Sequence, residues 1–233
     1  MTTKRIGLVG GLGPEATLEY YKGIINAFKS DNTSLNYPEI IIYSMNLSEL
    51  VGMMTRKEYD RVIVYLLGAI DSLKKAGADF AAMGANSPHL VFDELAQVSP
   101  LPLISIVESA YDEVRRLGLQ KPGLIGTGFT MSGTFYQDVF GRREIEVIVP
   151  EEPDMKIINE KLFSEIELGI FKDETRNLLI RIIEKMVHTQ HIDSLILGCT
   201  EFPLILTENE YAGIPMLNTT QLHIDAIVKY CRR

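Results

Sequence analysis

Cys199 has the residue type and the setting best suited to chemistry in this chain of 233 residues. It follows the apolar run Leu195–Leu197 and Gly198, so we expect it directly after a buried strand. A thiol at a strand end lies where backbone N–H groups can lower its pKa and make it an acid/base or a nucleophile. Free cysteines are also among the most buried residue types. From this motif alone, a catalytic role and a packing role for Cys199 are therefore equally favoured.

Short polar side chains elsewhere could bind an anion or move a proton. Asn86 and Ser87 offer donors that could hold a carboxylate. His89 could be a general base, although a structural role behind the neighbouring proline is favoured. Thr127 and Thr130 could donate hydrogen bonds to an anion, or could cap an ordinary turn. These residues are candidates for a substrate site.

Two further motifs are weak. His188 and His191 lie three residues apart with no third ligand nearby, so we predict no metal site. Gly11-x-Gly13-x-x-Ala16 fits the dinucleotide fingerprint, but Pro14 removes a backbone donor where phosphate would bind. No acidic residue ends a second strand at the expected spacing, because Glu39 precedes its strand. A tight glycine turn lining a pocket is the better interpretation.

Strands that alternate with helices must position these candidates. Amphipathic spacing predicts helices at Pro14–Phe28, Tyr59–Lys75 and Asp173–Val187. Apolar runs predict strands at Ile6–Val9, Glu39–Tyr43, Phe80–Met83, Leu103–Val107, Gly123–Ile125, Glu146–Val149, Leu195–Leu197 and Met216–Leu217. This alternation predicts an α/β fold with parallel sheets.

The chain contains an internal repeat. Three segment pairs match in the same order, at offsets that fall from 116 to 113 residues. They are Gly7–Gly10 with Gly123–Gly126, Asp79–Asn86 with Asp193–Thr200, and Leu101–Ser105 with Ile214–Asn218. Ordered matches with drifting offsets are what duplication followed by small loop changes would leave.

Duplication predicts two similar α/β lobes related by a pseudo-two-fold axis. We expect residues 1–103 plus about 216–233 in the first lobe and residues 104–215 in the second. Ligands of parallel sheets bind beyond the carboxyl ends of the strands, so the two lobes would face each other across a cleft. Cys199 then has a counterpart in the first lobe, and that position is Ala85.

The composition of the chain limits the classes of partner that it is expected to bind. The formal net charge of −8 argues against a nucleic-acid surface but allows a small anionic substrate. Two cysteines are too few for a disulfide framework, and no stretch approaches the ~20 apolar residues of a membrane span. The N-terminus leads straight into a strand without a signal-peptide pattern. We therefore expect a cytoplasmic protein with no membrane partner. We also expect a homodimer, because dimers are the commonest oligomers.

The motifs together resemble those of the aspartate/glutamate racemase family over essentially the whole chain. The matching pieces are Gly10–Thr17, Asn86–His89, Gly126–Met131 and Gly198–Glu201. The resemblance implies two α/β lobes with a substrate cleft between them. It also implies racemisation of an acidic amino acid without pyridoxal phosphate or any other cofactor. In such enzymes one cysteine removes the α-proton and a second returns a proton to the opposite face.

The sequence departs from this family pattern at two positions. Ala85 stands where the family has its first cysteine, and a methyl group can neither accept nor donate a proton. Ser87 is a poor substitute, because its unassisted pKa is far above that of a thiol. Glu167 falls in the segment where the family often carries a lysine for a substrate carboxylate. Lys161 or Lys172 could serve instead.

Three functions remain open. The first is an amino-acid racemase with Cys199 as acid/base, in which five donor residues hold substrate carboxylates. The second is a one-faced carbanion enzyme, such as a malonate-type decarboxylase. The third is a catalytically impaired protein that binds a dicarboxylate or an amino acid. The expected substrate-binding residues are Asn46, Asn86, Ser87, Thr127 and Thr200.

Overall fold

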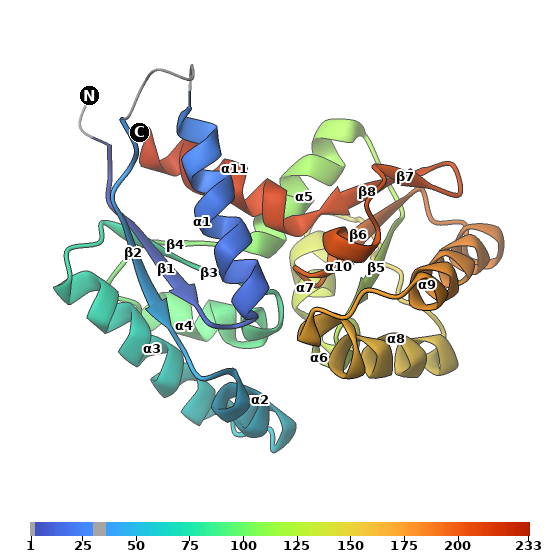
Figure 1. Ribbon diagram of the computed structural model, residues 1–233, viewed down its shortest axis with the longest axis horizontal. Coiled ribbons are helices and arrows are strands. Elements are labelled where there is room, and N and C mark those ends of the chain that lie inside the picture. Colours follow the sequence, from blue (N-terminus) through green and yellow to red (C-terminus); the bar gives the residue numbers. More distant parts are fainter. Residues whose placement is uncertain (1–2, 30–35) are drawn as a thin grey trace. The chain divides into compact units, whose positions relative to one another are not determined.

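The computed structural model describes residues 3–29 and 36–233, which fold into two compact units (Figure 1). The first unit comprises Met1–Ile106 and His223–Arg233, and the second comprises Val107–Leu222. Each unit contains one four-stranded sheet. Within the described residues, no helix is both long and apolar enough to cross a membrane.

The sheet of the first unit is entirely parallel, in the order β2-β1-β3-β4. Every residue of β1 and β3 is buried, as expected for strands covered by helices on both faces. The strands are β1 (Ile6–Gly10), β2 (Ile40–Ser44), β3 (Phe80–Met83) and β4 (Leu103–Ile104).

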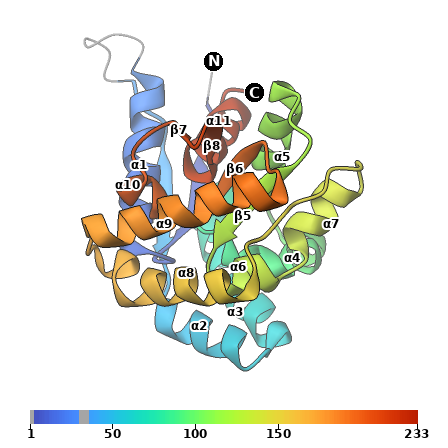
Figure 2. The same cartoon turned by 90° about the vertical axis from the view of Figure 1, so that its right-hand side faces the viewer.

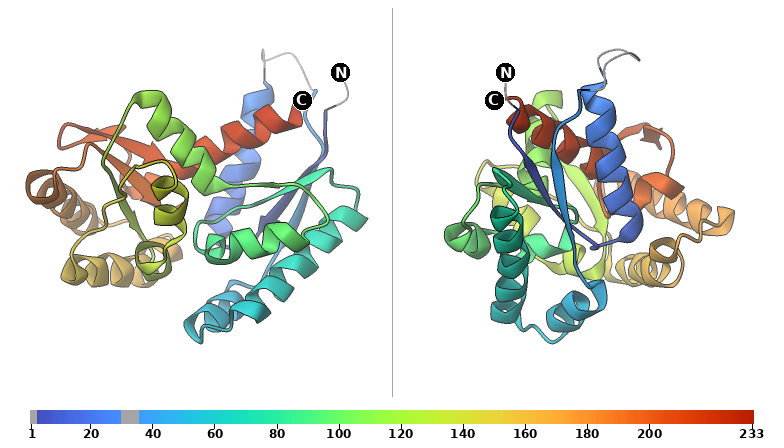
Figure 3. Two further views of the ribbon diagram at one scale, coloured as in Figure 1. Left: turned by 180° about the vertical axis from the view of Figure 1, so that it is seen from behind. Right: turned by 60° about the vertical axis from the view of Figure 1, so that its left-hand side comes forward.

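Helices cover both faces of this sheet. Tyr20 and Ile24 of α1 pack with Ile227 of α11 against Leu8 and Phe80. α3 lies on the opposite face with α4 beside it (Figure 3). The helices are α1 (Pro14–Phe28), α2 (Leu47–Thr55), α3 (Tyr59–Lys75), the 3-10 helix η1 (Ser87–Val91), α4 (Phe92–Val98) and α11 (Thr219–Cys231), which enters this unit at His223.

The sheet of the second unit has the order β5-β6-β8-β7, with only β7 antiparallel. α8 and α9 cross one face of it (Figure 2), where Leu162 and Ile183 pack with Leu195 and Leu197. The strands are β5 (Pro122–Gly126), β6 (Ser194–Gly198), β7 (Glu210–Tyr211) and β8 (Ile214–Asn218). The helical segments are α5 (Ile106–Leu117), α6 (Gly128–Ser132), α7 (Phe135–Gly141), α8 (Glu152–Ser164), η2 (Ile166–Leu168), α9 (Asp173–Lys185), η3 (Met186–Gln190) and α10 (Phe202–Ile205).

The three repeated segments form equivalent strands in the two units. β1, β3 and β4 are adjacent and parallel in the first sheet, and β5, β6 and β8 are adjacent and parallel in the second. The fourth strand differs, because β2 pairs with β1 whereas β7 pairs with β8. The prediction of an α/β fold with two similar parallel sheets is confirmed.

Two aspartates at matching positions of the repeat directly precede β3 and β6, and each binds backbone N–H groups of the segment before the neighbouring strand. The Asp79 carboxylate accepts the backbone N–H of Arg5 at 2.6 Å. The Asp193 carboxylate accepts the backbone N–H groups of Gln120 and Lys121 at 2.6 and 2.9 Å. The aspartates of the repeat therefore tie the start of one strand to the start of its neighbour.

We expect Asp193→Ala to lower the free energy of unfolding by about 1 to 2 kcal/mol, because two amides lose a charged acceptor. Urea unfolding followed by circular dichroism measures the difference. Asp112→Ala, at an exposed position of α5, is the matched control. A loss at Asp193 no larger than the loss at Asp112 would contradict this role of the carboxylate.

Two predicted strands differ from the observed structure. Glu146–Val149 is not a strand, since only an isolated bridge joins Gly123 to Ile148. Leu103–Val107 is a strand only over Leu103–Ile104, because α5 begins at Ile106. The predicted lobe boundaries lie after residue 103 and at about residue 216. Ile214–Asn218 hydrogen-bonds to β6, so the second unit extends to Leu222.

Candidate functional site

Cys199 and Thr127 follow the carboxyl ends of neighbouring strands. Gly126 of β5 is paired in register with Gly198 of β6, and the two candidate residues come next in the chain. A side chain at Gly198 has no room, since its Cβ would lie 2.8 Å from the carbonyl oxygen of Ile125. The glycine therefore lets the backbone carry Cys199 past a closely packed strand end.

The Cys199 thiol lies within hydrogen-bond distance of two carboxylates. Its Sγ is 3.0 Å from Glu201 Oε2 and 3.3 Å from Glu167 Oε1. The Thr200 hydroxyl donates to the same Glu201 oxygen at 2.8 Å. Cys199 is only 5% exposed and Glu201 only 2%, whereas Glu167 is half-buried. The half-buried carboxylate is thus the more accessible of the two beside the thiol.

The electrostatics of this cluster are unusual. Burial raises the pKa of Cys199 well above its ordinary value, and the charges of Glu201 and Glu167 raise it further. Burial and the charge of Glu201 raise the pKa of Glu167 to about 7. The thiol pKa is therefore raised, not lowered as its position after a strand end had led us to expect. A backbone hydrogen bond from Glu201 does lower it, but burial and two carboxylates outweigh that contact.

Glu201 is the residue that the sequence analysis missed. Its Oε1 is buried and accepts no hydrogen bond from the described residues. The signal was available in the sequence, because Glu201 stands only two positions after Cys199. The thiol, Glu167 and Glu201 each offer a ligand atom, and these atoms lie within 4.8 Å of one another, so a divalent cation could be held there.

A buried ion cluster fixes the segment that carries Glu167. Glu165 is bonded to Lys161 at 2.8 Å and to Lys172 at 3.1 Å, and it also accepts from Thr175. The hydrogen bonds from Lys161 and Thr175 lower the pKa of Glu165 to about 2. Both lysines that could have bound a substrate carboxylate are therefore paired with a protein carboxylate.

We expect Glu165→Gln to destabilise the protein in a pH-dependent way. A carboxylate with a lowered folded-state pKa stabilises the fold above its ordinary pKa of 4.5, and that stabilisation is lost as pH falls toward about 2. Urea midpoints of wild type and variant should differ most above pH 4.5 and converge below it. Glu174→Gln, which changes an exposed carboxylate of α9, should follow the wild type. A gap that stays constant with pH would contradict this.

Thr127 has a clear structural role. It is the N-cap of α6, where its hydroxyl accepts the backbone N–H of Thr130 at 3.3 Å. The N–H of Gly128 is taken by Asn159 Oδ1 at 2.6 Å. The capping role, one of the two roles considered for Thr127, is therefore observed. Binding of an anion by Thr127 remains a prediction.

The candidates of the first unit lie at the corresponding sheet edge. Val9 of β1 is in register with Met83 of β3, and Gly84, Ala85 and Asn86 follow Met83. Asn86 is buried, Ser87 is half-buried and begins η1, and Ala85 is 8% exposed. The edge thus gathers polar and small side chains, as predicted from the strand ends.

Asn46 also follows a strand end in this unit. Gly10 of β1 is paired with Ser44 of β2, two residues before it. Asn46 is exposed and caps α2, with Oδ1 accepting the N–H of Ser48 at 3.0 Å. Its side-chain oxygen is therefore engaged, and its role toward a substrate remains a prediction.

His89 is a structural residue. The backbone N–H of Ile106 donates to its Nε2 at 3.2 Å, so Nδ1 carries the proton and donates to the Ala85 carbonyl at 3.1 Å. Burial, together with the smaller effect of nearby His223, lowers the pKa of His89 to about 3. Both ring nitrogens are occupied, which leaves no free base.

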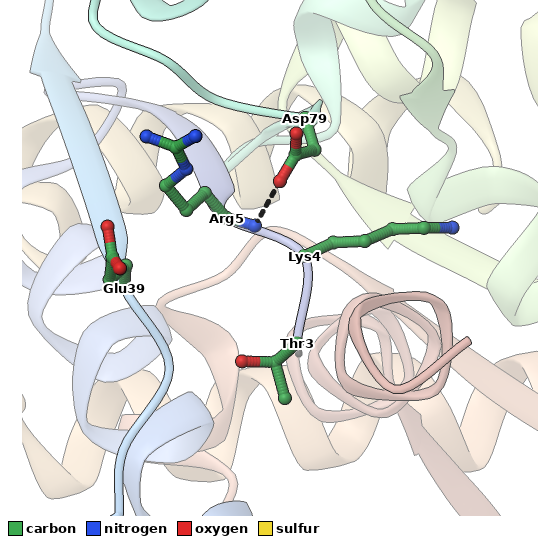
Figure 4. Close-up of a pocket in the computed structure, with 5 residues that line it drawn as sticks. All are labelled: Thr3, Lys4, Arg5, Glu39 and Asp79. Atoms are coloured by element: carbon green, nitrogen blue, oxygen red, sulfur yellow. Dashed lines mark hydrogen bonds between the residues drawn. The ribbon is translucent and has the colours of Figure 1, made fainter. Parts of the chain in front are cut away.

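A hollow of about 600 Å³ opens at the other end of the first sheet (Figure 4). Thr3, Lys4, Arg5, Glu39 and Asp79 line it, at the amino ends of the strands. Ligands of parallel sheets bind at the carboxyl ends. The candidate residues of the first unit, Asn86 and Ser87, instead follow the carboxyl end of β3, at the opposite edge of this sheet.

Comparisons with known proteins agree with these motifs. Residues 9–227 match the family described as Asp/Glu/Hydantoin racemase. The broad specificity amino-acid racemase RacX of Bacillus subtilis (strain 168) is 24% identical over 218 residues, which are 92% of each chain.

Two crystal structures share the fold at higher identity. One, from Yersinia pestis and provisionally named an Asp/Glu racemase, is 31% identical with a TM-score of 0.88, over 99% of this chain and all (100%) of that one. The other, an aspartate racemase homologue from Pyrococcus horikoshii OT3, is 32% identical with a TM-score of 0.82, over the same shares of 99% and 100%. The family match spans most of the chain and contains all four motif segments, from Gly10–Thr17 to Gly198–Glu201. This chain belongs to the Asp/Glu/Hydantoin racemase family.

Proposed function

We propose that this protein is a cofactor-independent amino-acid racemase in which Cys199 exchanges the α-proton. The observation that carries the proposal is the Cys199 thiol held between Glu167 and Glu201 at a strand end, in a chain of a racemase family. A relative named a broad specificity amino-acid racemase supports the reaction class.

The two carboxylates give the buried thiol a nearby proton acceptor, which it needs because its pKa is raised. The thiol first gives its proton to Glu167 or Glu201, and the thiolate then takes the α-proton of the substrate. The C–H electron pair stays on the substrate as a carbanion delocalised into the α-carboxylate. A substrate ammonium group near the carboxylates would offset their charge and lower the cost of the thiolate.

The step that lacks an assigned acid is the return of a proton to the opposite face of the α-carbon. We propose that Ala85 stands on that face in place of the family's first cysteine, and its methyl group supplies no proton. Ser87 or a water would then complete inversion, since both ring nitrogens of His89 are engaged. Asn46, Asn86, Ser87, Thr127 and Thr200 are proposed to hold the substrate carboxylates.

One-faced carbanion chemistry is the second candidate, because Ala85 leaves Cys199 without a partner thiol. A malonate-type decarboxylase would need only one proton donor. Its dianionic substrate, however, would approach a thiol already flanked by two carboxylates. Repulsion between like charges therefore favours a zwitterionic amino acid.

Incubation of both enantiomers of a panel of amino acids in D₂O tests the proposal. We expect α-deuteration and the appearance of the opposite enantiomer on chiral chromatography. Carbon dioxide release from substituted malonates, lost in Cys199→Ser, would favour the decarboxylase instead. Tight ligand binding with no deuteration of any amino acid would leave only a binding protein.

A further inference from the structure

We infer that the preferred substrate carries a neutral or cationic side chain rather than a carboxylate, and that Glu167 determines this preference. The inference rests on the proposed function, because it concerns the substrate that meets Cys199. It reverses the expectation of an acidic substrate that the family resemblance gave.

The first argument is the position of Glu167. Its Oε1 lies 3.3 Å from Cys199 Sγ, so any α-carbon that reaches the thiol comes close to this carboxylate. Glu167 is half-buried, whereas Glu201 is 2% exposed, so Glu167 is the carboxylate that a ligand meets first. The pKa of Glu167 is about 7, so its carboxylate is ionised above neutral pH. A substrate carboxylate there then faces a like charge at short range, without the screening of bulk water.

The second argument is that the nearby lysines are already paired. Lys161 and Lys172 both donate to Glu165 Oε1, and the side chain of Glu165 is only 9% exposed. Releasing either lysine to a substrate would weaken the compensation of a buried charge. The cations next to Glu167 in sequence are therefore committed to holding its segment in place.

The segments that carry the candidate residues and the strand ends are poor in cations. None of them contains a lysine or an arginine, although glutamates occur at positions 15, 165, 167 and 201. The segments are Gly10–Thr17, Ser44–Leu47, Gly84–His89, Gly126–Gly133, Glu165–Gly169 and Gly198–Pro203. His89 is neutral, because its pKa is lowered to about 3. A side-chain carboxylate of the substrate has no cationic partner among these residues.

Glutamine and glutamate have side chains of the same shape and length, so comparing them as substrates isolates the effect of the side-chain charge. Wild type, Glu167→Gln, Glu167→Lys and Glu174→Lys are incubated with L-glutamine, L-glutamate and L-lysine in D₂O. α-Deuteration followed by NMR gives kcat/KM for each pair. Using ratios within one variant cancels any general loss of activity, and circular dichroism checks the fold.

Wild type should deuterate glutamine and lysine at least about tenfold more efficiently than glutamate. Glu167→Gln should shrink the glutamine/glutamate ratio and Glu167→Lys should invert it. Glu174→Lys makes the same charge change at an exposed position of α9 and should leave the ratio unchanged. A wild type that prefers glutamate, or a ratio insensitive to residue 167, would overturn the inference alone. No deuteration of any amino acid would overturn the proposed function and the inference together.

Discussion

Cys199→Ser is expected to lower the rate of α-proton exchange by about a thousandfold or more. A positioned acid/base group contributes typically about 10² to 10⁴ to a rate, and a serine hydroxyl has a pKa far above that of a thiol. Serine keeps nearly the same shape and can still donate to Glu167 and Glu201, so the fold should be unaffected. Deuterium incorporation at the α-carbon, measured by NMR, gives the rate.

Cys231→Ser is the matched control for this variant. Cys231 is the other free thiol, is buried in the first unit and donates to the Lys4 carbonyl at 3.0 Å. Because nothing in the proposed reaction uses it, the exchange rate should stay at the wild-type value. An equal loss in both variants would point to a general structural effect. An undiminished rate in Cys199→Ser would remove the thiol from the mechanism.

Ala85→Cys is expected to raise the rate of enantiomer inversion by about tenfold or more, because it supplies a proton donor for the second face. Exchange with retention of configuration depends on Cys199 alone and should change much less. The ratio of inversion to α-deuteration therefore isolates the missing step. Chiral chromatography and NMR on the same samples give both rates.

Ala85→Ser separates the effect of the thiol from the effect of side-chain size. A serine at this position adds a heavy atom and a hydroxyl, but it is a poor acid/base at neutral pH. It should leave the inversion rate near the wild-type value. If Ala85→Cys folds and its new thiol is alkylated, yet inversion is unchanged, position 85 does not face the substrate.

Most of the strands, and the repeat, could be predicted from the sequence. Strands such as Phe80–Met83 are continuous apolar runs between turn residues, and such runs have few alternatives in an α/β chain. Glu146–Val149 was mistaken for a strand because an apolar pattern does not say whether a neighbouring strand is within reach. The matching aspartates Asp79 and Asp193 were found in the repeat, but their shared role as backbone anchors needed coordinates.

The candidate site was harder to predict, because its electrostatics depend on distant segments. Glu167 lies 32 residues before Cys199, and its segment is held beside the thiol by the contacts of Glu165 with Lys161 and Lys172. The sequence could suggest a lowered thiol pKa from a strand-end position, but it could not show burial between two carboxylates. The homodimer and the cytoplasmic location remain predictions from sequence.

Exchange of the α-proton of an amino acid by Cys199 is measured most directly by NMR in D₂O. Wild-type protein and Cys199→Ser are incubated in parallel with L-glutamine and L-lysine, and the loss of the α-proton signal is followed. We expect loss of that signal with wild type and a rate lower by about a thousandfold with the variant. Equal rates in the two proteins, or no exchange in either, would contradict it.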